Sequence, residues 1–272
     1  MALRKLGLYI ISIFALVILV ACGNKVSGED KVITLAVFDD PVFKEIADVA
    51  VEKVAEQGYK LDLKYVSDIV TPNKLVDSGE VYANFFQHYA YMNEYNKANN
   101  SNLVGAIEVF IDPAGLYSKK ITSINQLPNG AKVSIPNDPA NNGRALFMLQ
   151  KEGVLKLREG VSVTEAKVND IVENPKNLKF IEVEQQMLGR TLEDVDLGFM
   201  FTAIAVSSGL NPDEAIVIEN EKDDIQPFTI VITTRSEDTD SEKTKVLQKA
   251  FQNDEVYKVL KENYPLVLTS WK

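Results

Sequence analysis

Residues 32–65 read VITLAVFDDPVFKEIADVAVEKVAEQGYKLDLKY, and this stretch decides the fold class. Val32 to Phe38 is an apolar run of strand length. Asp39-Asp40-Pro41 then supplies a carboxylate cap and a proline for the first turn of a helix. Apolar residues recur every three or four positions as far as Gln57, Gly58 closes the helix, and a strand alternates over 61–65. A strand, a helix and a strand in this order form a right-handed βαβ unit and predict a parallel sheet.

The same rhythm continues to the C-terminus. We expect strands near 81–85, 104–111, 131–135, 178–183, 197–200, 215–218 and 228–233, and helices near 72–78, 89–98, 141–152, 240–251 and 254–262. The pattern restarts near Asp112, which predicts two α/β lobes joined by extended crossings near 109–116 and 227–233. We predict that residues 32–110 and 229–272 form lobe 1 and that residues 111–228 form lobe 2. Ligands of such sheets bind beyond the carboxyl ends of strands, here in the groove between the lobes.

The N-terminal segment predicts export and lipid anchoring. Arg4 and Lys5 precede an apolar run that ends in Leu19-Val20-Ala21-Cys22, the pattern of a bacterial lipoprotein signal. We predict that residues 1–21 are removed and that Cys22 carries diacylglycerol and palmitate-type chains. Residues 22–31 would then be a flexible tether, and the protein would sit on the extracytoplasmic face of a bacterial cell membrane. The alternative is a buried cysteine beside a membrane anchor helix, although the apolar run is shorter than the about 20 residues that a spanning helix needs.

Charge and motif content exclude several classes of function. The formal net charge is −10, and without residues 1–21 the chain holds 27 basic against 39 acidic side chains. Such an acidic chain repels nucleic acid, so we expect no nucleic-acid partner. With a single histidine and a single cysteine we expect no metal site, and without a phosphate-binding glycine loop or a nucleophile elbow we expect no cofactor and no enzyme activity.

The first candidate site is the aromatic segment ANFFQHYAY, residues 83–91. It places the single histidine, His88, among aromatic rings where a strand should end. Rings at such a point can hold an apolar side chain, and an imidazole can donate to a carbonyl or carboxylate. A core aromatic cluster around a hydrogen-bonded histidine is the alternative interpretation.

The second candidate site is IPNDPANNGRAL, residues 135–146. A strand should end at Ile135, and Arg144 should fall in the first turn of the helix that follows. Free N–H groups at a helix start attract an anion, and a guanidinium can hold a carboxylate with two hydrogen bonds. A salt bridge within the protein is the alternative role for Arg144.

These segments resemble the methionine-binding lipoprotein (MetQ/NlpA) family, the substrate-binding components of ABC importers. The resemblance covers nearly the whole chain after residue 31 and rests on these stretches: PNK (72–74), ANFFQH (83–88), GLYSKK (115–120), IPNDP (135–139), GRAL (143–146), NPKNL (174–178), DVD (194–196) and NDEV (253–256). It implies a two-lobed, periplasmic-binding-protein-like (type II) α/β fold that closes over one small amino-acid-like ligand. It further implies an ABC permease and ATPase complex as partner.

The resemblance also implies which residues line the pocket. Phe86, His88 and Tyr91 would surround a methionine side chain, and Asn141 and Arg144 would hold the polar end of the amino acid. Arg144 would take the carboxylate.

Three positions depart from the family pattern. The family usually has tyrosine where this chain has Ile69, and asparagines that bind the polar end of the ligand where this chain has Phe201 and Ile230. A buried charge without partners is costly, and the loss of two such hydrogen bonds would cost about 2–6 kcal/mol, or roughly 30-fold to 10⁴-fold in affinity. Our hypothesis is therefore that a more apolar carboxylate, a methionine derivative or a short peptide suits this pocket better than methionine.

Two functions follow from this reading. The first is a solute receptor that delivers a small ligand to an ABC permease. The second is a surface lipoprotein of the same fold whose pocket has diverged and which serves as an adhesion or interaction module.

Overall fold

The computed structural model describes residues 31–220 and 225–272. The predicted signal segment, the acylation site Cys22 and the predicted tether up to residue 30 lie outside these residues. Residues 33–272 form one unit that contains both large sheets described below.

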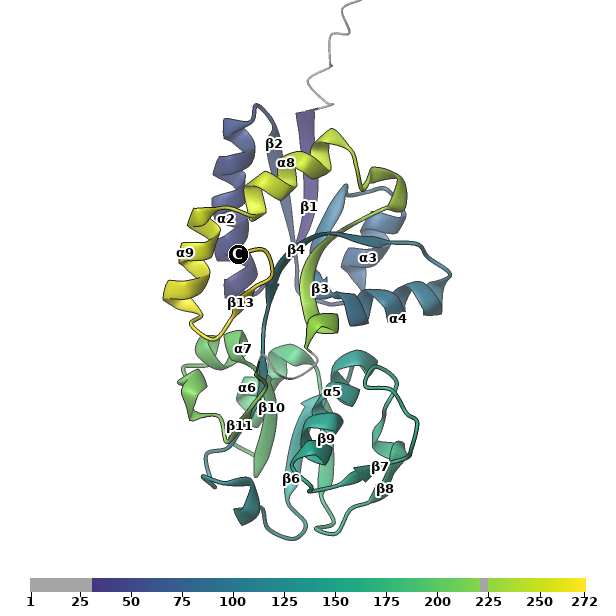
Figure 1. Cartoon of the computed structure of the whole chain (residues 1–272), viewed down its shortest axis with the longest axis vertical. Helices are drawn as coiled ribbons and strands as arrows, with labels where there is room; N and C mark the ends of the chain where they lie inside the picture. Colours follow the sequence, from purple (N-terminus) through teal and green to yellow (C-terminus); the bar gives the residue numbers. More distant parts are fainter. Residues whose placement is uncertain (1–30, 221–224) are drawn as a thin grey trace, which may run out of the picture. The chain divides into compact units, whose positions relative to one another are not determined.

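Lobe 1 is built on a six-stranded sheet with the strand order β13-β4-β12-β3-β1-β2 (Figure 1). Its strands are β1 (Val32–Phe38), β2 (Lys60–Val66), β3 (Ala83–His88), β4 (Val104–Ile111), β12 (Thr229–Thr234) and β13 (Leu268–Thr269). Its helices are α2 (Pro41–Glu56), α3 (Thr71–Asp77), α4 (Tyr89–Asn99), α8 (Glu242–Phe251) and α9 (Asp254–Asn263).

Lobe 2 is built on a five-stranded sheet with the strand order β11-β5-β10-β6-β9. Its strands are β5 (Ala114–Tyr117), β6 (Lys132–Pro136), β9 (Lys179–Val183), β10 (Leu197–Phe201) and β11 (Val217–Ile218). A separate two-stranded sheet pairs β7 (Lys156–Leu157) with β8 (Ile171–Glu173). The helices of this lobe are α5 (Pro139–Lys151), α6 (Leu188–Thr191) and α7 (Thr202–Ser207).

The opening βαβ prediction is confirmed in its elements but not in the direction of the whole sheet. Asp40 caps α2 by accepting a hydrogen bond from the Val42 N–H at 3.2 Å, and Gly58 adopts φ +76° at its end. β1 and β3 are parallel, but β12 runs antiparallel to both β3 and β4. The sheet is mixed because β12 returns from lobe 2 and enters the sheet from the end at which β3 and β4 leave it.

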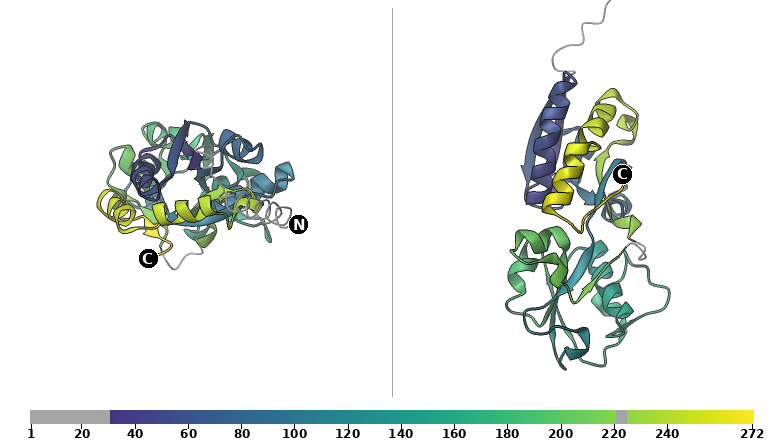
Figure 2. Two further views of the ribbon diagram at one scale, coloured as in Figure 1. Left: turned by 90° about the horizontal axis from the view of Figure 1, so that it is seen from above. Right: turned by 60° about the vertical axis from the view of Figure 1, so that its left-hand side comes forward.

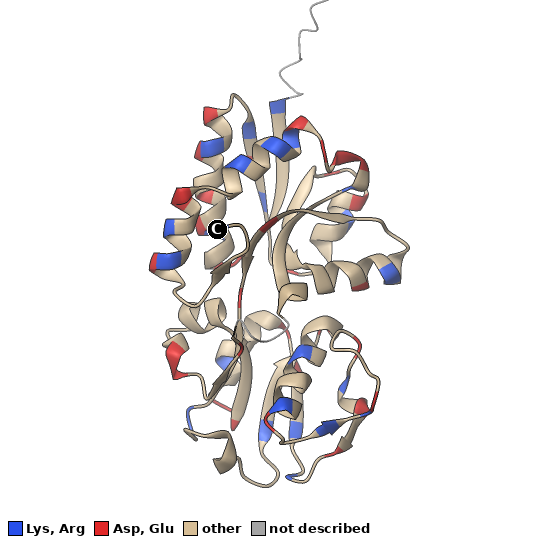
Figure 3. Cartoon of the chain, viewed as in Figure 1, with Lys and Arg blue, Asp and Glu red and all other residues tan. Residues whose placement is uncertain are grey.

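Apolar faces hold each lobe together. α2 buries a stripe spaced three and four residues apart against the sheet. The core of lobe 1 includes the rings of Phe43, Phe85, Phe110 and Phe251, which meet edge to face. Lobe 2 has its own core around β5, β6 and β10. α2 also packs beside α8 and α9 (Figure 2). Charged residues are plentiful on α2, α8 and α9 (Figure 3), where Lys53 of α2 pairs with Glu255 of α9 at 2.7 Å.

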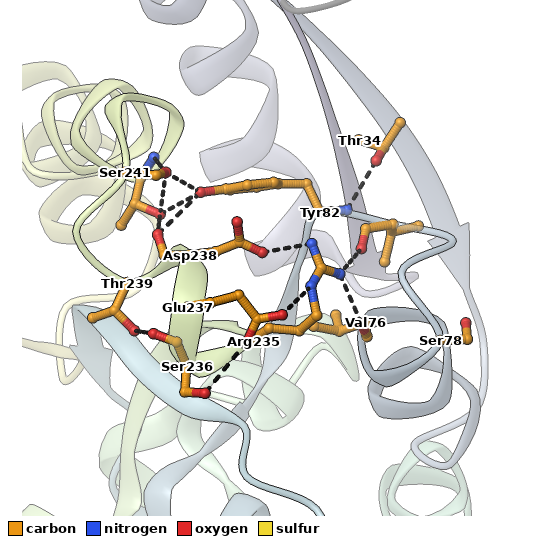
Figure 4. Close-up of polar contacts among 12 residues, drawn as sticks. Thr34, Val76, Ser78, Tyr82, Arg235, Ser236, Glu237, Asp238, Thr239 and Ser241 are labelled. Atoms are coloured by element: carbon orange, nitrogen blue, oxygen red, sulfur yellow. Dashed lines mark hydrogen bonds and ion pairs between the residues drawn. The ribbon is translucent and has the colours of Figure 1, made fainter.

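A polar cluster fastens the returning chain to lobe 1 (Figure 4). The Arg235 guanidinium donates to the carbonyl oxygens of Val76 at 2.9 Å and Val81 at 3.2 Å and pairs with Asp238 at 2.5 Å. The Tyr82 hydroxyl contacts the Thr244 hydroxyl at 2.7 Å. The segment between β12 and α8 is thereby tied to the start of β3, at the end of β12 away from Ile230.

Candidate ligand-binding site

A cavity lies between the two lobes, where strands of both sheets end. Its volume is about 50 Å³, and residues from both lobes line it. β1, β3 and β4 reach it with their carboxyl ends from lobe 1, and β10 reaches it with its carboxyl end from lobe 2. β12 runs in the opposite direction, so its amino end reaches the cavity, and Ile230 is paired with His88 in the sheet. The mixed strand directions therefore bring distant segments to one place.

Every residue predicted from the sequence to contact the ligand lines this cavity: Ile69, Phe86, His88, Tyr91, Asn141, Arg144, Phe201 and Ile230. Their contact with a ligand stays a prediction, because the geometry gives their position and not an occupant.

His88 is buried and its ring makes hydrogen bonds within the protein. Its Nδ1 caps α4 by accepting from the Tyr91 N–H at 3.1 Å, so the proton of the neutral ring lies on Nε2 and is donated to the Asn141 Oδ1 at 3.0 Å. Burial, with the Arg144 charge nearby, lowers the pKa of His88 to about 3. In this structure the ring N–H is donated to Asn141, which is the hydrogen-bonded histidine of the alternative interpretation. Donation from the imidazole to a ligand stays a prediction.

α5 begins two residues earlier than predicted. Asp138 caps it, accepting from the Asn141 N–H at 3.0 Å, with Pro139 as the first helical residue. Arg144 therefore lies in the second turn, and the helix start is already capped by a carboxylate. The Asn141 amide group also donates to Asp138, at 3.0 and 3.2 Å, as does Gln185 at 3.1 Å. His88, Asn141, Asp138 and Gln185 thus form one network that joins the two lobes.

Arg144 is paired with a carboxylate of the protein itself. Its Nε donates to Glu219 Oε1 at 2.9 Å and its Nη2 to Glu219 Oε2 at 2.5 Å, and both side chains are more than nine-tenths buried. Nη2 also donates to the Asp112 carbonyl oxygen at 3.1 Å, while Nη1 has no hydrogen-bond partner among the described residues. The guanidinium lies 4.1 Å from the ring centre of Phe228. The structure therefore shows the internal salt bridge, the alternative role that the sequence left open.

Several other groups at the cavity were not predicted from the sequence. The sequence indicates a helix cap at Asp40, a restart of the pattern near Asp112 and a strand at Phe228, yet all three residues line the cavity, as does Gln185. Asp112 accepts from the Thr202 hydroxyl at 2.5 Å and the Ala203 N–H at 3.2 Å. Burial raises the pKa of Asp112 to about 7 and that of Asp40 to about 6. Asp112 could have been predicted from one pattern, an acidic residue within a crossing that borders the predicted groove.

Most of the remaining lining is apolar. Rings from β1, α2, β3 and β4 supply most of it: Phe38, Phe43, Phe86 and Phe110. The Tyr91 hydroxyl donates to the Ile69 carbonyl oxygen at 2.9 Å, and its ring meets Phe86 edge to face. The cavity can therefore hold an apolar side chain against aromatic rings.

Known proteins resemble this chain in sequence and in architecture. A sequence model of the family described as NlpA lipoprotein matches residues 33–267. The chain belongs to the NlpA lipoprotein family. It is 41% identical over 218 residues to the D-methionine-binding lipoprotein MetQ of Salmonella typhi, covering 79% of each chain, and 38% identical to a probable protein of that name in Vibrio cholerae, covering 90% of each.

Solved structures agree with this assignment. A nutrient-binding protein from Burkholderia cenocepacia bound to methionine is 36% identical, with a TM-score of 0.80 over 88% of this chain and 99% of that one. A lipoprotein of Bacillus subtilis, described as a candidate methionine-binding protein, is 33% identical, with a TM-score of 0.82 over 90% of this chain and 100% of that one. The family resemblance and the two-lobed α/β fold predicted from the sequence are confirmed.

Residues 31–220 and 225–272 contain no helix that is both long and apolar enough to cross a membrane. They also contain no group of three or more His, Cys, Asp or Glu side chains placed to hold a metal ion.

Proposed function

We propose that this protein is a lipid-anchored solute receptor that delivers methionine, a related amino acid or a short peptide to an ABC permease. In this proposal residues 32–110 and 229–272 act as one lobe and residues 111–228 as the other. The observation that carries it is the cavity between the lobes, because all eight positions predicted from the family resemblance line it. Relatives named as methionine-binding lipoproteins support the same ligand class.

The anchoring part of the proposal rests on Cys22 and on the lipoprotein names of the relatives. Two acyl chains hold a protein on a membrane where one chain does not. We expect the intact mass of the membrane form to begin at Cys22 with added diacylglycerol, and Cys22→Ala to abolish membrane retention. A mature mass that still includes residues 1–21 would contradict this part.

The ligand part is tested by denaturing the freshly purified protein and identifying released small molecules by mass spectrometry. We expect a small molecule with an amine and an apolar side chain. The same compound should raise the melting temperature of the protein by mass action. Absence of any released compound, together with no thermal shift from amino acids, amines or short peptides, would refute the receptor function.

We propose no catalytic role and no adhesion role. The single histidine donates its ring N–H to Asn141, so it is not arranged as a base beside a nucleophile. An adhesion module would not need a cavity lined by residues from eight separate segments.

A further inference from the structure

The charges around the cavity do not match those of a free amino acid. Among the described residues that line the cavity, Arg144 carries the one positive charge, since His88 is neutral. Arg144 is already neutralised by Glu219, which holds two of its nitrogen atoms. A free carboxylate on the ligand would therefore find no uncompensated cation and would face the charge of Glu219 behind Arg144.

By contrast, two carboxylates that line the cavity have no ion-pair partner among the described residues. Asp112 follows β4 and Asp40 follows β1, and both line the cavity. Neither forms an ion pair with a Lys or Arg side chain within the described part of the chain. Asp112 is more than nine-tenths buried, and its hydrogen bonds come from the uncharged Thr202 hydroxyl and Ala203 N–H. Burial raises the pKa of Asp112, and the charge of Asp40 raises it further, as expected for two acids in one pocket.

The two apolar positions, Phe201 and Ile230, line the same cavity as these carboxylates. Thr202 and Ala203, which bind Asp112, directly follow Phe201, and Ile230 also lines the cavity. The two positions where the family resemblance expects amides thus offer no polar group, while Asp112 supplies a charge in the same region. A carboxylate recognises an ammonium group more strongly than a neutral amide does.

One nitrogen atom of Arg144 is not used by these internal hydrogen bonds. Nη1 has no hydrogen-bond partner among the described residues, and it can donate to an uncharged carbonyl oxygen without leaving Glu219. An amide or peptide carbonyl would accept this hydrogen bond and bring no negative charge into the cavity.

We propose that the cavity selects a ligand with a free ammonium group held by Asp112 and Asp40, an apolar side chain held by the phenylalanine rings, and a carboxyl group that is blocked or absent. This inference rests on the proposed function and names its substrate class. Such a group is found in an amino acid amide, in the N-terminal residue of a short peptide, and in a simple alkyl amine.

The test is isothermal titration calorimetry on the full-length protein in detergent micelles at pH 8, with five related compounds. L-methioninamide and L-methionylglycinamide have a blocked carboxyl group, 3-(methylthio)propylamine has none, L-methionine has both charges, and 4-(methylthio)butanoate lacks the amine. We expect at least one of the first three to bind about 10-fold to 100-fold more tightly than methionine, and the butanoate to give no heat. Which of the three binds most tightly tells whether the natural source is an amide, a peptide or an amine.

Three variants sharpen the test. Asp112→Asn and Asp40→Asn should each weaken the preferred cationic compound by about 10-fold or more and reduce its advantage over methionine. Asp40→Asn carries the test if Asp112→Asn does not fold. Asp39→Asn is the matched control, because Asp39 lies next to Asp40 but pairs with Lys44 on the surface, so it should keep the advantage.

The outcomes separate this inference from the function on which it rests. Methionine binding more tightly than all three cationic compounds, or an advantage unchanged in both cavity variants, would overturn the inference and leave the receptor function standing. A protein that binds none of the five and releases no small molecule on denaturation would overturn both.

Discussion

The substitution Glu219→Gln tests the neutralisation of Arg144, on which the reading of the cavity depends. Glu219 is 8% exposed at its side chain and Arg144 is 2% exposed, so neither charge is solvated by bulk water. Removing one partner of a buried pair typically costs about 3–5 kcal/mol because the other charge is left uncompensated. Glutamine keeps the shape and one acceptor oxygen, so we take the lower end, about 3 kcal/mol.

This free energy is measurable as a change in melting temperature. For a domain of this size each kcal/mol corresponds to about 2–4 °C, so circular dichroism should show a fall of roughly 6–12 °C. The variant also leaves Arg144 with its charge available. Methionine at a fixed concentration should therefore stabilise Glu219→Gln more than it stabilises the unmodified protein.

Glu173→Gln is the matched control, since Glu173 pairs with Lys156 at 3.0 Å while both side chains are more than 60% exposed. Such a pair contributes at most about 1 kcal/mol, so its melting temperature should change little. Equal effects of the two substitutions, or a methionine shift no larger in Glu219→Gln than in the unmodified protein, would refute the internal-pair reasoning.

Three further predictions concern the cavity and its supports. Burial raises the pKa of Asp112 to about 7 and that of Asp40 to about 6, so the folded state holds protons that the unfolded state releases. The free energy of unfolding should therefore fall as pH rises from about 4 to 7, and urea unfolding should show a smaller fall in Asp112→Asn. The other charged groups that act on the two carboxylates are Arg144, Asp39, Lys44 and Glu45. Arg235→Met should lower stability by about 1–3 kcal/mol, because the Val76 and Val81 carbonyls lose their donor, and calorimetry should show unchanged ligand affinity. In Gly143→Ala the new methyl group would lie 1.9 Å from the Val163 carbonyl oxygen, so thermal denaturation should show a loss of about 1–3 kcal/mol, and an unchanged melting temperature would contradict the close approach.

Much of the fold followed from local patterns in the sequence. The Asp40-Pro41 cap and the apolar spacing of 42–54 define α2, and most other elements lie within two or three residues of their predicted limits. The helix at 139 was predicted too late because the capping residue Asp138 was assigned to the preceding turn. β13 was not predicted, since a two-residue edge strand carries almost no periodic signal. The direction of β12 also escaped prediction, because it depends on where the chain returns between lobes.

The site shows a different limit of sequence reasoning. The lining residues were predicted because strand ends and family motifs mark them. Their hydrogen-bond partners were not, because a partner is set by tertiary packing: Glu219 lies 75 positions from Arg144, and Asn141 lies 53 positions from His88. Residue types suggested an arginine and a histidine free to bind a ligand. The structure places each in a network that already satisfies most of its hydrogen-bonding groups.

The loss of amides and the presence of carboxylates have one consequence when taken together. Amides at positions 201 and 230 would recognise an ammonium group and a carboxylate alike, because each amide carries both a donor and an acceptor. In our proposal the phenylalanine and isoleucine side chains recognise neither, so discrimination rests on Asp40 and Asp112, which attract a cation when they are ionised. Polar recognition in this cavity is therefore asymmetric: a positive end of the ligand meets charge, whereas a negative end meets a guanidinium that Glu219 has already neutralised. The proposed receptor would therefore discriminate by the sign of the charge on its ligand, and the apolar side chain would add affinity without changing that preference.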